Sequence, residues 1–288
     1  MTYRGRFAPS PTGQLHFGSL VAALGSWLCA RHAGGQWLLR MEDIDPPREV
    51  PGAAAAMLTA LPRFGLLADA PVLWQSQRIA AYDAAFERLR ATNQVFPCWC
   101  SRSELVATDG MHRDGRCVAA ADPARAPAWR LRTPDVTLSF DDALQGPQRQ
   151  NLRDSAGDFV VRRVEGFYSY QLACVVDDAH QGITEVVRGS DLLESTPRQI
   201  WLQRLLGLHT PSYRHLPLVL DAQGHKLSKS TRALPVDPAD PLPALRQALA
   251  FLQQPAVPAA LGVQDLLTHA LAHFKPALLP HCSGHSGV

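Results

Sequence analysis

The order of the apolar segments is the feature that most constrains how this chain of 288 residues can fold. A short strand pattern at 4–8 precedes a helix pattern that starts near Ser19, a residue type that suits a helix N-cap. A buried strand pattern at 37–43 follows, and helix patterns at 52–64 and 77–91 come next. Strands that alternate with helices in this way predict an α/β fold with a parallel sheet and right-handed crossovers.

The alternation is interrupted once and then resumes. Residues 97–157 are rich in Pro, Asp, Arg and Gly and show no clear α/β alternation, so they are predicted to form an inserted module. After this segment we expect strands at 158–163, 183–189 and 216–220, helices at 168–182 and 196–207, and two or three short helices in 237–288. The chain therefore divides into 1–96, the insert 97–157, 158–236 and a short helical C-terminal region, 237–288.

Composition excludes several classes of protein. A hydrophobic content of 46% with 19% charged residues predicts a packed core and not a disordered chain. The net charge is only +2, so any nucleic-acid surface must be a local patch. No apolar run reaches ~18 residues, and the N-terminus lacks the apolar core of a signal peptide. Six scattered cysteines do not form a disulfide framework. We therefore expect a reduced, cytoplasmic enzyme without a membrane partner.

Two segments indicate phosphate chemistry. The hexapeptide HKLSKS at 225–230 holds Lys226 and Lys229, two of the three lysines in the chain. A compact ammonium suits a crowded polyphosphate better than a guanidinium does. In RFAPSPTGQLHFGS, a predicted helix N-terminus offers free N–H groups to a phosphate, His16 can donate a hydrogen bond, and Gly18 lets a nucleoside approach the backbone. Taken separately, the segments could also be a solvated loop and an ordinary strand–turn–helix with a structural histidine.

Together, HFGS and KLSKS resemble the HIGH and KMSKS signatures of class I aminoacyl-tRNA synthetases. RFAPSPTGQLHFGS, RMEDID (40–45), YQLACVVDD (170–178) and VVRGSDLL (186–193) resemble the glutamyl branch of that class, and several separated motifs are more specific than one. The last His of HIGH is Ser19 here, whose hydroxyl can still donate to phosphate. The resemblance implies a Rossmann-like catalytic domain in two halves, 1–96 and 158–236.

The resemblance also implies a role for each matching side chain. The glutamate pocket would consist of Arg6, Ser10, Glu42, Tyr170 and Arg188. Arg6 and Arg188 suit the two carboxylates of glutamate, and Glu42 suits its ammonium. By contrast, the neighbouring charged residues of RMEDID are interpreted as braces of the strand end through local ion pairs; these are Arg40, Asp43 and Asp45.

The implied reaction is adenylate formation, in which a glutamate carboxylate oxygen attacks the α-phosphate of ATP and pyrophosphate leaves. Such a transfer depends mostly on positioning and charge neutralisation. His16 and Lys229 are the catalytic candidates, and the residues expected to contact ATP are His16, Gly18, Ser19, Lys226 and Lys229. Mg²⁺ is expected to accompany ATP.

A second chemical signal lies in the insert. Cys98, Cys100, His112 and Cys117 offer four soft or borderline ligands within 98–117, which favours one tetrahedral structural Zn²⁺. Similar family members carry a Tyr ligand four residues before the last Cys, but that position is Arg113 here, which cannot ligate. His112 is the predicted substitute, and Asp114 is a weaker alternative. The other interpretation is three unrelated free cysteines in a loop-rich insert.

The segment after KLSKS narrows the resemblance further. Only 58 residues follow Ser230 (288 − 230), too few for an anticodon-binding domain of ~100–150 residues. This length resembles the truncated paralogues called glutamyl-Q tRNA(Asp) synthetases. They activate glutamate without tRNA and transfer it to queuosine at the wobble position of tRNA(Asp). The implied partners are L-glutamate and the queuosine-containing anticodon stem-loop of tRNA(Asp), whose splayed bases can enter a cleft; a monomer is expected.

Two alternatives remain open from the sequence. One is a minimal glutamyl-tRNA synthetase that charges the 3′ end of tRNA. The other is a catalytically idle paralogue that regulates by binding RNA or glutamate, although a complete pocket together with both lysines counts against it.

Overall fold

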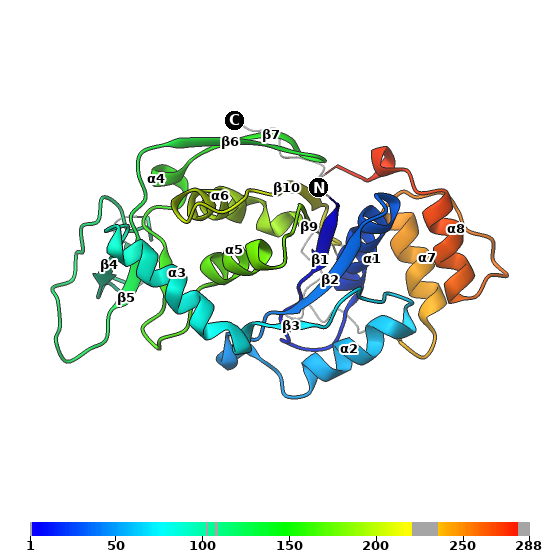
Figure 1. Ribbon diagram of the computed structural model, residues 1–288, viewed down its shortest axis with the longest axis horizontal. Helices are drawn as coiled ribbons and strands as arrows, with labels where there is room; N and C mark the ends of the chain where they lie inside the picture. Colours follow the sequence, from blue (N-terminus) through cyan, green and yellow to red (C-terminus); the bar gives the residue numbers. More distant parts are fainter. Residues whose placement is uncertain (1, 102, 107–108, 221–235, 282–288) are drawn as a thin grey trace.

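Parallel strands organise the computed structural model, which describes residues 2–101, 103–106, 109–220 and 236–281. The first sheet has the order β1 (Arg4–Phe7), β2 (Gln36–Met41) and β3 (Leu73–Trp74), with all pairs parallel. β9 (Glu185–Gly189) and β10 (Ser212–Leu216) form a second parallel pair. The two sheets lie side by side, since the Thr184 amide donates to the Arg4 carbonyl at 2.9 Å (Figure 1). The predicted parallel α/β arrangement is therefore confirmed.

Helix α1 (Phe17–His32) packs between these strands and the C-terminal helices α7 (Pro241–Phe251) and α8 (Val263–Ala272). It forms here because Leu20, Leu24 and Leu28 recur at helical spacing, and all three are completely buried. Burial of each leucine contributes ~1.5–3 kcal/mol relative to exposure, which fixes α1 against the sheet.

A second group of helices covers the other half of the molecule (Figure 1). It consists of α3 (Ile79–Ala91), α5 (Tyr170–His180) and α6 (Thr196–Leu205), which pack on one another around a separate apolar cluster. The remaining short elements are α2 (Ala53–Arg63), α4 (Leu152–Ser155), and 3-10 turns at Pro46–Arg48, Gln75–Arg78, Ser190–Ser195 and Pro276–Leu278. No helix in the described part of the chain is long and apolar enough to cross a membrane.

Two sequence predictions differ from the structure in position. Helix α1 begins at Phe17, and its N-cap is His16 and not Ser19, because the imidazole Nδ1 accepts the Ser19 amide at 3.3 Å. The strand predicted at 216–220 lies at Ser212–Leu216, and Pro217 follows directly with no N–H to donate to a ladder. Tyr213 and His215 of SYRHL are both buried, but the segment contains several polar residue types, so its alternation of buried and exposed positions does not show as an alternation of apolar and polar residues.

Strands within the predicted insert, 97–157, pair with strands that precede and follow it in the sequence. β4 (Val95–Cys98) pairs antiparallel with β5 (Ala128–Leu131), which in turn pairs with β8 (Val160–Arg162). β6 (Thr137–Asp142) and β7 (Gly146–Asn151) form a hairpin, and β6 meets β10 in parallel at Asp142 and Tyr213. The hairpin therefore extends the β9–β10 sheet and brings residues of this segment close to the sheet interior.

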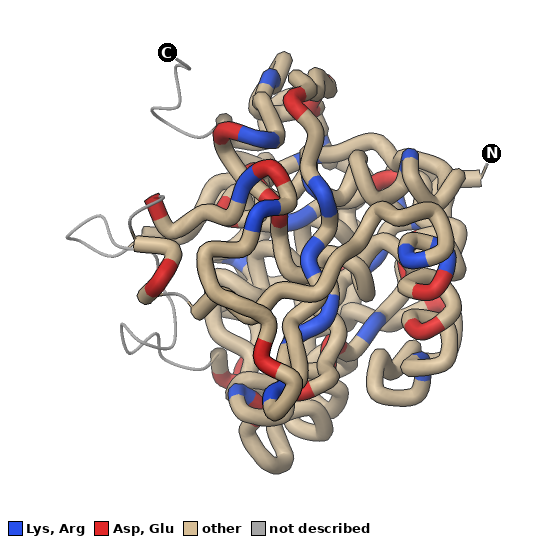
Figure 2. Tube along the Cα trace, turned by 90° about the vertical axis from the view of Figure 1, so that its left-hand side faces the viewer, with Lys and Arg blue, Asp and Glu red and all other residues tan. Residues whose placement is uncertain are grey.

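Charged residues are unevenly spread along the backbone trace. Figure 2 looks at the side of the molecule that carries β4 and β5 and shows Lys and Arg segments following one another down its middle. Asp and Glu segments lie mainly around the edges of this view. A chain with a net charge of only +2 therefore still brings several Lys and Arg positions together on one side of the molecule.

Candidate active site

A cavity of about 780 Å³ opens where β1, β9 and β10 end and α1 begins. Ligands of open α/β sheets bind at this edge, beyond the carboxyl ends of the strands. The cavity is lined by all the predicted ATP and glutamate residues within the described chain: Arg6, Ser10, His16, Gly18, Ser19, Glu42, Tyr170 and Arg188. The two remaining predicted residues, Lys226 and Lys229, lie outside the described residues.

One end of the cavity is formed by the N-terminus of α1. His16, Gly18 and Ser19 line it, and the His16 Nε2 lies 2.9 Å from the Ser19 hydroxyl. The amides of a first helical turn and the positive end of the helix dipole favour anions. This end of the cavity therefore has the chemistry of a phosphate site.

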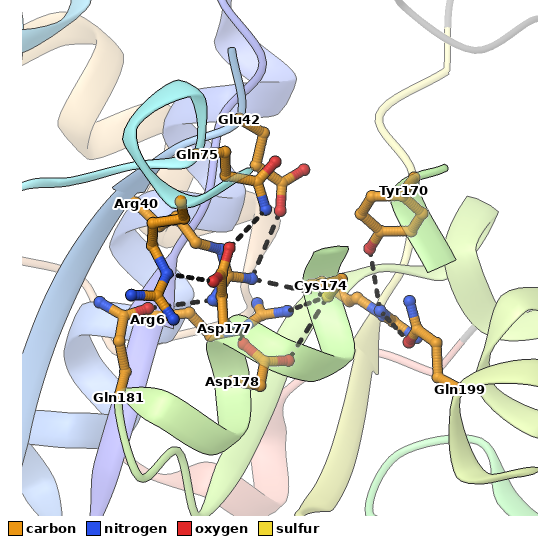
Figure 3. A network of polar contacts seen from close by, with 12 residues as sticks. Arg6, Arg40, Glu42, Gln75, Tyr170, Cys174, Asp177, Asp178, Gln181 and Gln199 are labelled. Atoms are coloured by element: carbon orange, nitrogen blue, oxygen red, sulfur yellow. Dashed lines mark hydrogen bonds and ion pairs between the residues drawn. The ribbon is translucent and has the colours of Figure 1, made fainter. Parts of the chain in front are cut away.

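The other end has a buried cluster of two arginines and two carboxylates (Figure 3). Asp178 accepts from Arg6 Nε at 3.1 Å and from Arg40 Nη1 at 2.7 Å, and Arg40 Nη2 reaches Glu42 at 3.3 Å. Arg6 is 3% exposed and Arg40 is 0% exposed. The local ion pair predicted for Arg40 is present, but the shorter contact is with Asp178 on α5, so Arg40 links β2 to that helix.

The charges of this cluster act on one another. Burial by itself raises the pKa of Asp178, but Arg40 and Arg6 outweigh it and hold that pKa well below its usual range. Burial raises the pKa of Glu42, and the same arginines offset only part of the rise. Glu42 also lines the cavity, so a cationic group of a ligand would favour its ionised form.

Asp43 and Asp45 have partners outside this cluster. Asp43 accepts from the Ser76 amide at 2.9 Å and the Ser76 hydroxyl at 2.6 Å. Asp45 pairs with Arg48 and, at 3.0 Å, with Arg163. These contacts brace the end of β2. The predicted ion pairing is present for Asp45, whereas Asp43 is held by hydrogen bonds from Ser76 and forms no ion pair in the described part of the chain.

Arg188 enters the cavity from the end of β9. Its Nη1 donates to Gln199 at 2.8 Å and to the Tyr170 hydroxyl at 3.1 Å, and its Nη2 donates to Thr196 at 2.8 Å. Burial raises the pKa of Tyr170 above its usual value, so this hydroxyl stays protonated and can donate to a ligand. The Arg188 Nη2 also donates to the Leu192 carbonyl at 3.3 Å, so each N–H of Arg188 has an acceptor in the protein. None of these acceptors is a carboxylate, and no carboxylate in the described part of the chain forms an ion pair with Arg188, so its positive charge is not neutralised there.

A separate cluster brings together the four predicted metal ligands. The ligand atoms of Cys98, Cys100, His112 and Cys117 all lie within 4.8 Å of one another. His112 Nδ1 lies 2.9 Å from Asp158, whose carboxylate oxygens also accept the amides of Gly115 and Thr133. Because both Asp158 oxygens act as acceptors, His112 Nδ1–H donates to this carboxylate, and the buried Nε2 is left with a lone pair and no hydrogen-bond partner in the described chain. A carboxylate behind a ligating histidine is the usual support of a metal site.

The two residues that follow His112, Arg113 and the alternative ligand Asp114, have other partners. Arg113 donates to the carbonyls of Arg153 and Asp154. Asp114 is held by Arg153 at 2.9 Å. The donor set of three thiols and one imidazole fits tetrahedral Zn²⁺.

Four side chains of the site were given no ligand-positioning role from the sequence: Arg40, Asp178, Gln199 and His215. Asp178 lies inside YQLACVVDD, where its spacing from Tyr170 places both on α5. No pattern in the sequence marks His215, because its contact with Arg188 depends on the pairing of β9 with β10.

Comparison with known proteins places this geometry in a family. The profile described as tRNA synthetases class I (E and Q), catalytic domain, matches residues 2–240. A protein of Xanthomonas axonopodis pv. citri named glutamyl-Q tRNA(Asp) synthetase is 58% identical over 280 residues, 96% of this chain and 93% of that protein. One of the same name from Burkholderia mallei is 56% identical over 261 residues, 87% of this chain and 88% of the relative.

A solved structure gives the same answer at the level of the fold. The glutamate tRNA ligase from Elizabethkingia meningosepticum, in complex with its amino acid, superposes with a TM-score of 0.81 at 26% identity. The match covers 99% of this chain but 66% of that one, so the chain spans just under two thirds of the ligase. On these similarities, the chain belongs to the class I aminoacyl-tRNA synthetase family, in the branch of the glutamyl-Q tRNA(Asp) synthetases.

Proposed function

We propose that this protein activates L-glutamate with ATP in the absence of tRNA and then transfers the glutamyl group to queuosine at the wobble position of tRNA(Asp). The observation that carries the proposal is a single cavity with an anion-binding helix N-terminus at one end and Arg6, Arg188 and Glu42 at the other. The relatives named glutamyl-Q tRNA(Asp) synthetase support the choice of acceptor.

Glutamate fits the charges of the cavity. Arg6 and Arg188 would each bind one of its carboxylates, Tyr170 and Ser10 would donate hydroxyl hydrogen bonds, and Glu42 would receive the ammonium. Asp178 already holds Arg6 through Nε, so the arginine is oriented before the substrate arrives. Such preorganisation lowers the entropy lost on binding.

In the first step, a glutamate carboxylate oxygen forms a bond to the α-phosphorus of ATP, and the bond to pyrophosphate breaks. The amides at the start of α1 and the side chains of His16 and Ser19 would hold the phosphates, with Gly18 leaving room for the nucleoside. Lys229, supported by Lys226, would neutralise the charge that develops on pyrophosphate. Mg²⁺ bound to ATP would supply further charge neutralisation.

In the second step, a hydroxyl of the queuosine cyclopentene ring attacks the acyl carbon, and AMP leaves. The concentration of Lys and Arg in Figure 2 suits contacts with RNA phosphates. Anticodon-loop bases are unstacked and can enter a pocket that a duplex cannot.

We further propose that one Zn²⁺ binds Cys98, Cys100, His112 and Cys117. It would tie the end of β4 to the loop that follows it and stabilise a segment with few buried apolar side chains. Its role would be structural, because the four protein ligands complete a tetrahedral coordination shell.

A second candidate is a minimal glutamyl-tRNA synthetase, which the similarity to the glutamate tRNA ligase favours. It shares the activation step and differs only in the acceptor.

Activation is tested by ATP–pyrophosphate exchange without tRNA. We expect exchange with L-glutamate and not with L-glutamine or L-aspartate, because two arginines must each meet a carboxylate at the spacing of glutamate. Arg188→Lys keeps the charge but loses the fork that holds Gln199, Tyr170 and Thr196, so it should raise the KM for glutamate. Absence of exchange with glutamate in the wild-type protein would refute the proposed activation.

A further inference from the structure

Arg188 is supported from behind by a buried histidine and a buried aspartate. Its Nε donates to His215 Nε2 at 3.0 Å, and His215 Nδ1 lies 2.6 Å from Asp142 Oδ2. The three residues come from β9, β10 and β6, and they are 5%, 0% and 3% exposed. These contacts connect Asp142, in the β6–β7 hairpin, through His215 to Arg188, which lines the cavity.

The hydrogen bonds allow only one arrangement of protons. A guanidinium Nε always carries hydrogen, so His215 Nε2 must be an acceptor toward Arg188. The ring is therefore neutral, and its single proton is on Nδ1, where it is donated to Asp142. Burial lowers the pKa of His215, and Asp142 offsets only part of this shift. The other neighbours of the ring are the Thr196 hydroxyl, 3.3 Å from Nε2, and the stacked ring of Tyr213.

Asp142 is itself fixed by the turn that follows it. Its Oδ1 accepts three backbone amides, from Leu144 at 3.0 Å, Gln145 at 2.9 Å and His215 at 3.2 Å. This leaves Oδ2 for the imidazole and gives the carboxylate a single orientation. The turn between β6 and β7 therefore determines which ring nitrogen of His215 can accept.

We propose that Asp142 and His215 are positioning residues for the substrate carboxylate that Arg188 binds. Asp142 selects the Nδ1–H tautomer of His215, and this tautomer holds Nε of Arg188 so that its charge is presented to the cavity in one orientation. The Nη atoms of Arg188 are held by Gln199, Tyr170, Thr196 and the Leu192 carbonyl, and His215 holds Nε. The inference rests on the proposed function, since it assumes that Arg188 binds glutamate.

Asp142→Asn tests the inference with almost no change of shape. The three amides require an acceptor at the Oδ1 position, so the new NH₂ group must occupy the Oδ2 position and donate to Nδ1. The ring proton of His215 then moves to Nε2, so two N–H donors face each other and the hydrogen bond from Arg188 Nε is lost. We expect the KM for glutamate in pyrophosphate exchange to rise about ten- to a hundredfold, the effect of an unpaired buried donor, with little change in the KM for ATP.

Two further variants separate positioning from general support of the fold. Asp141→Asn changes the exposed neighbour on β6 and should leave both KM values unchanged. His215→Phe keeps a ring but has no nitrogen through which Asp142 could act on Arg188, so adding Asp142→Asn to it should raise the glutamate KM no further. Equal increases of the KM for ATP and for glutamate, or additive effects in the double variant, would overturn the positioning role.

A readout that is independent of activity distinguishes this inference from the proposed function. The nitrogen chemical shifts of labelled histidine, assigned by comparison with His215→Phe, should report Nδ1–H in the wild-type protein and Nε2–H in Asp142→Asn. An Nε2–H or doubly protonated His215 in the wild-type protein would refute the inference even if glutamate is activated. Failure of the wild-type protein to exchange pyrophosphate with glutamate, with the expected tautomers present, would instead refute the function assigned to Arg188.

Discussion

Asp178→Asn should destabilise the protein strongly, because this carboxylate serves two buried arginines. It accepts from Arg6 at 3.1 Å and from Arg40 at 2.7 Å, and the side chains of the three residues are 6%, 3% and 0% exposed. The substitution keeps the volume but leaves Glu42 as the one carboxylate that pairs with either arginine in the described chain. Because the arginine side chains are almost completely buried, solvent cannot compensate their charges when the carboxylate is removed.

The magnitude follows from the burial of the three side chains. Removing one partner of a buried ion pair costs ~3–5 kcal/mol, and the amide oxygen that remains can still accept one hydrogen bond, so we expect a loss of about 3 kcal/mol. This is a large part of the ~5–15 kcal/mol that stabilises a typical protein. Urea denaturation at neutral pH measures the free energy of unfolding, and the slope with denaturant should not change.

A matched control is Glu87→Gln, which breaks the Arg90–Glu87 pair on α3. Both of its side chains are more than half exposed, and such a pair contributes at most ~0.5 kcal/mol. If Asp178→Asn lost no more stability than Glu87→Gln, the Arg6–Asp178–Arg40 cluster would not be the electrostatic anchor that its geometry indicates.

Further outcomes follow from other parts of the chain. Lys229→Ala should lower glutamate-dependent pyrophosphate exchange by ~10²–10³, and Lys229→Arg should recover little; near-normal exchange in the Ala variant would remove its catalytic role. Protein purified without chelator should contain about one zinc per chain by elemental analysis, less in His112→Ala and an unchanged amount in Arg113→Ala, whereas zinc-free wild-type protein would refute the metal site. Stability should fall on acidification. Burial raises the pKa of Asp142, but the hydrogen bond to His215 and backbone amides lower it overall, so its contribution is complete above ~3.9 and is lost as the pH falls through the lower folded pKa. The lowered pKa of His215 acts in the same direction below ~6.5, so a urea midpoint that does not change with pH would contradict both assignments.

The parallel α/β arrangement could be predicted because it depends on local patterns. The leucines of α1 recur at helical spacing, and the apolar strands alternate with helices along the chain. Strand β10 was misplaced because its buried residues include His215, whose polarity hides the alternation, while the apolar LPLVL is interrupted by Pro217. A pattern of residue types predicts burial only where buried residues are apolar.

The same distinction applies to the site. The side chains that line the cavity stand in short motifs, so their chemistry could be inferred from RFAPSPTGQLHFGS and VVRGSDLL. The residues behind them could not, because the contacts of Arg40 with Asp178 and of His215 with Asp142 join residues far apart in the sequence. His112 was predicted as a metal ligand, but the support from Asp158 depends on how distant loops pack.

The central claim concerns the acceptor, and transfer of labelled glutamate to defined RNAs tests it most directly. We expect the label on tRNA(Asp) that contains queuosine, on the same tRNA without its terminal adenosine, and on the isolated queuosine-bearing anticodon stem-loop. We expect none on tRNA(Asp) with guanosine at the wobble position, because the ring hydroxyl that attacks the adenylate is absent. Labelling that requires the terminal adenosine and persists without queuosine would show that the chain charges the 3′ end of tRNA and would contradict the proposed function.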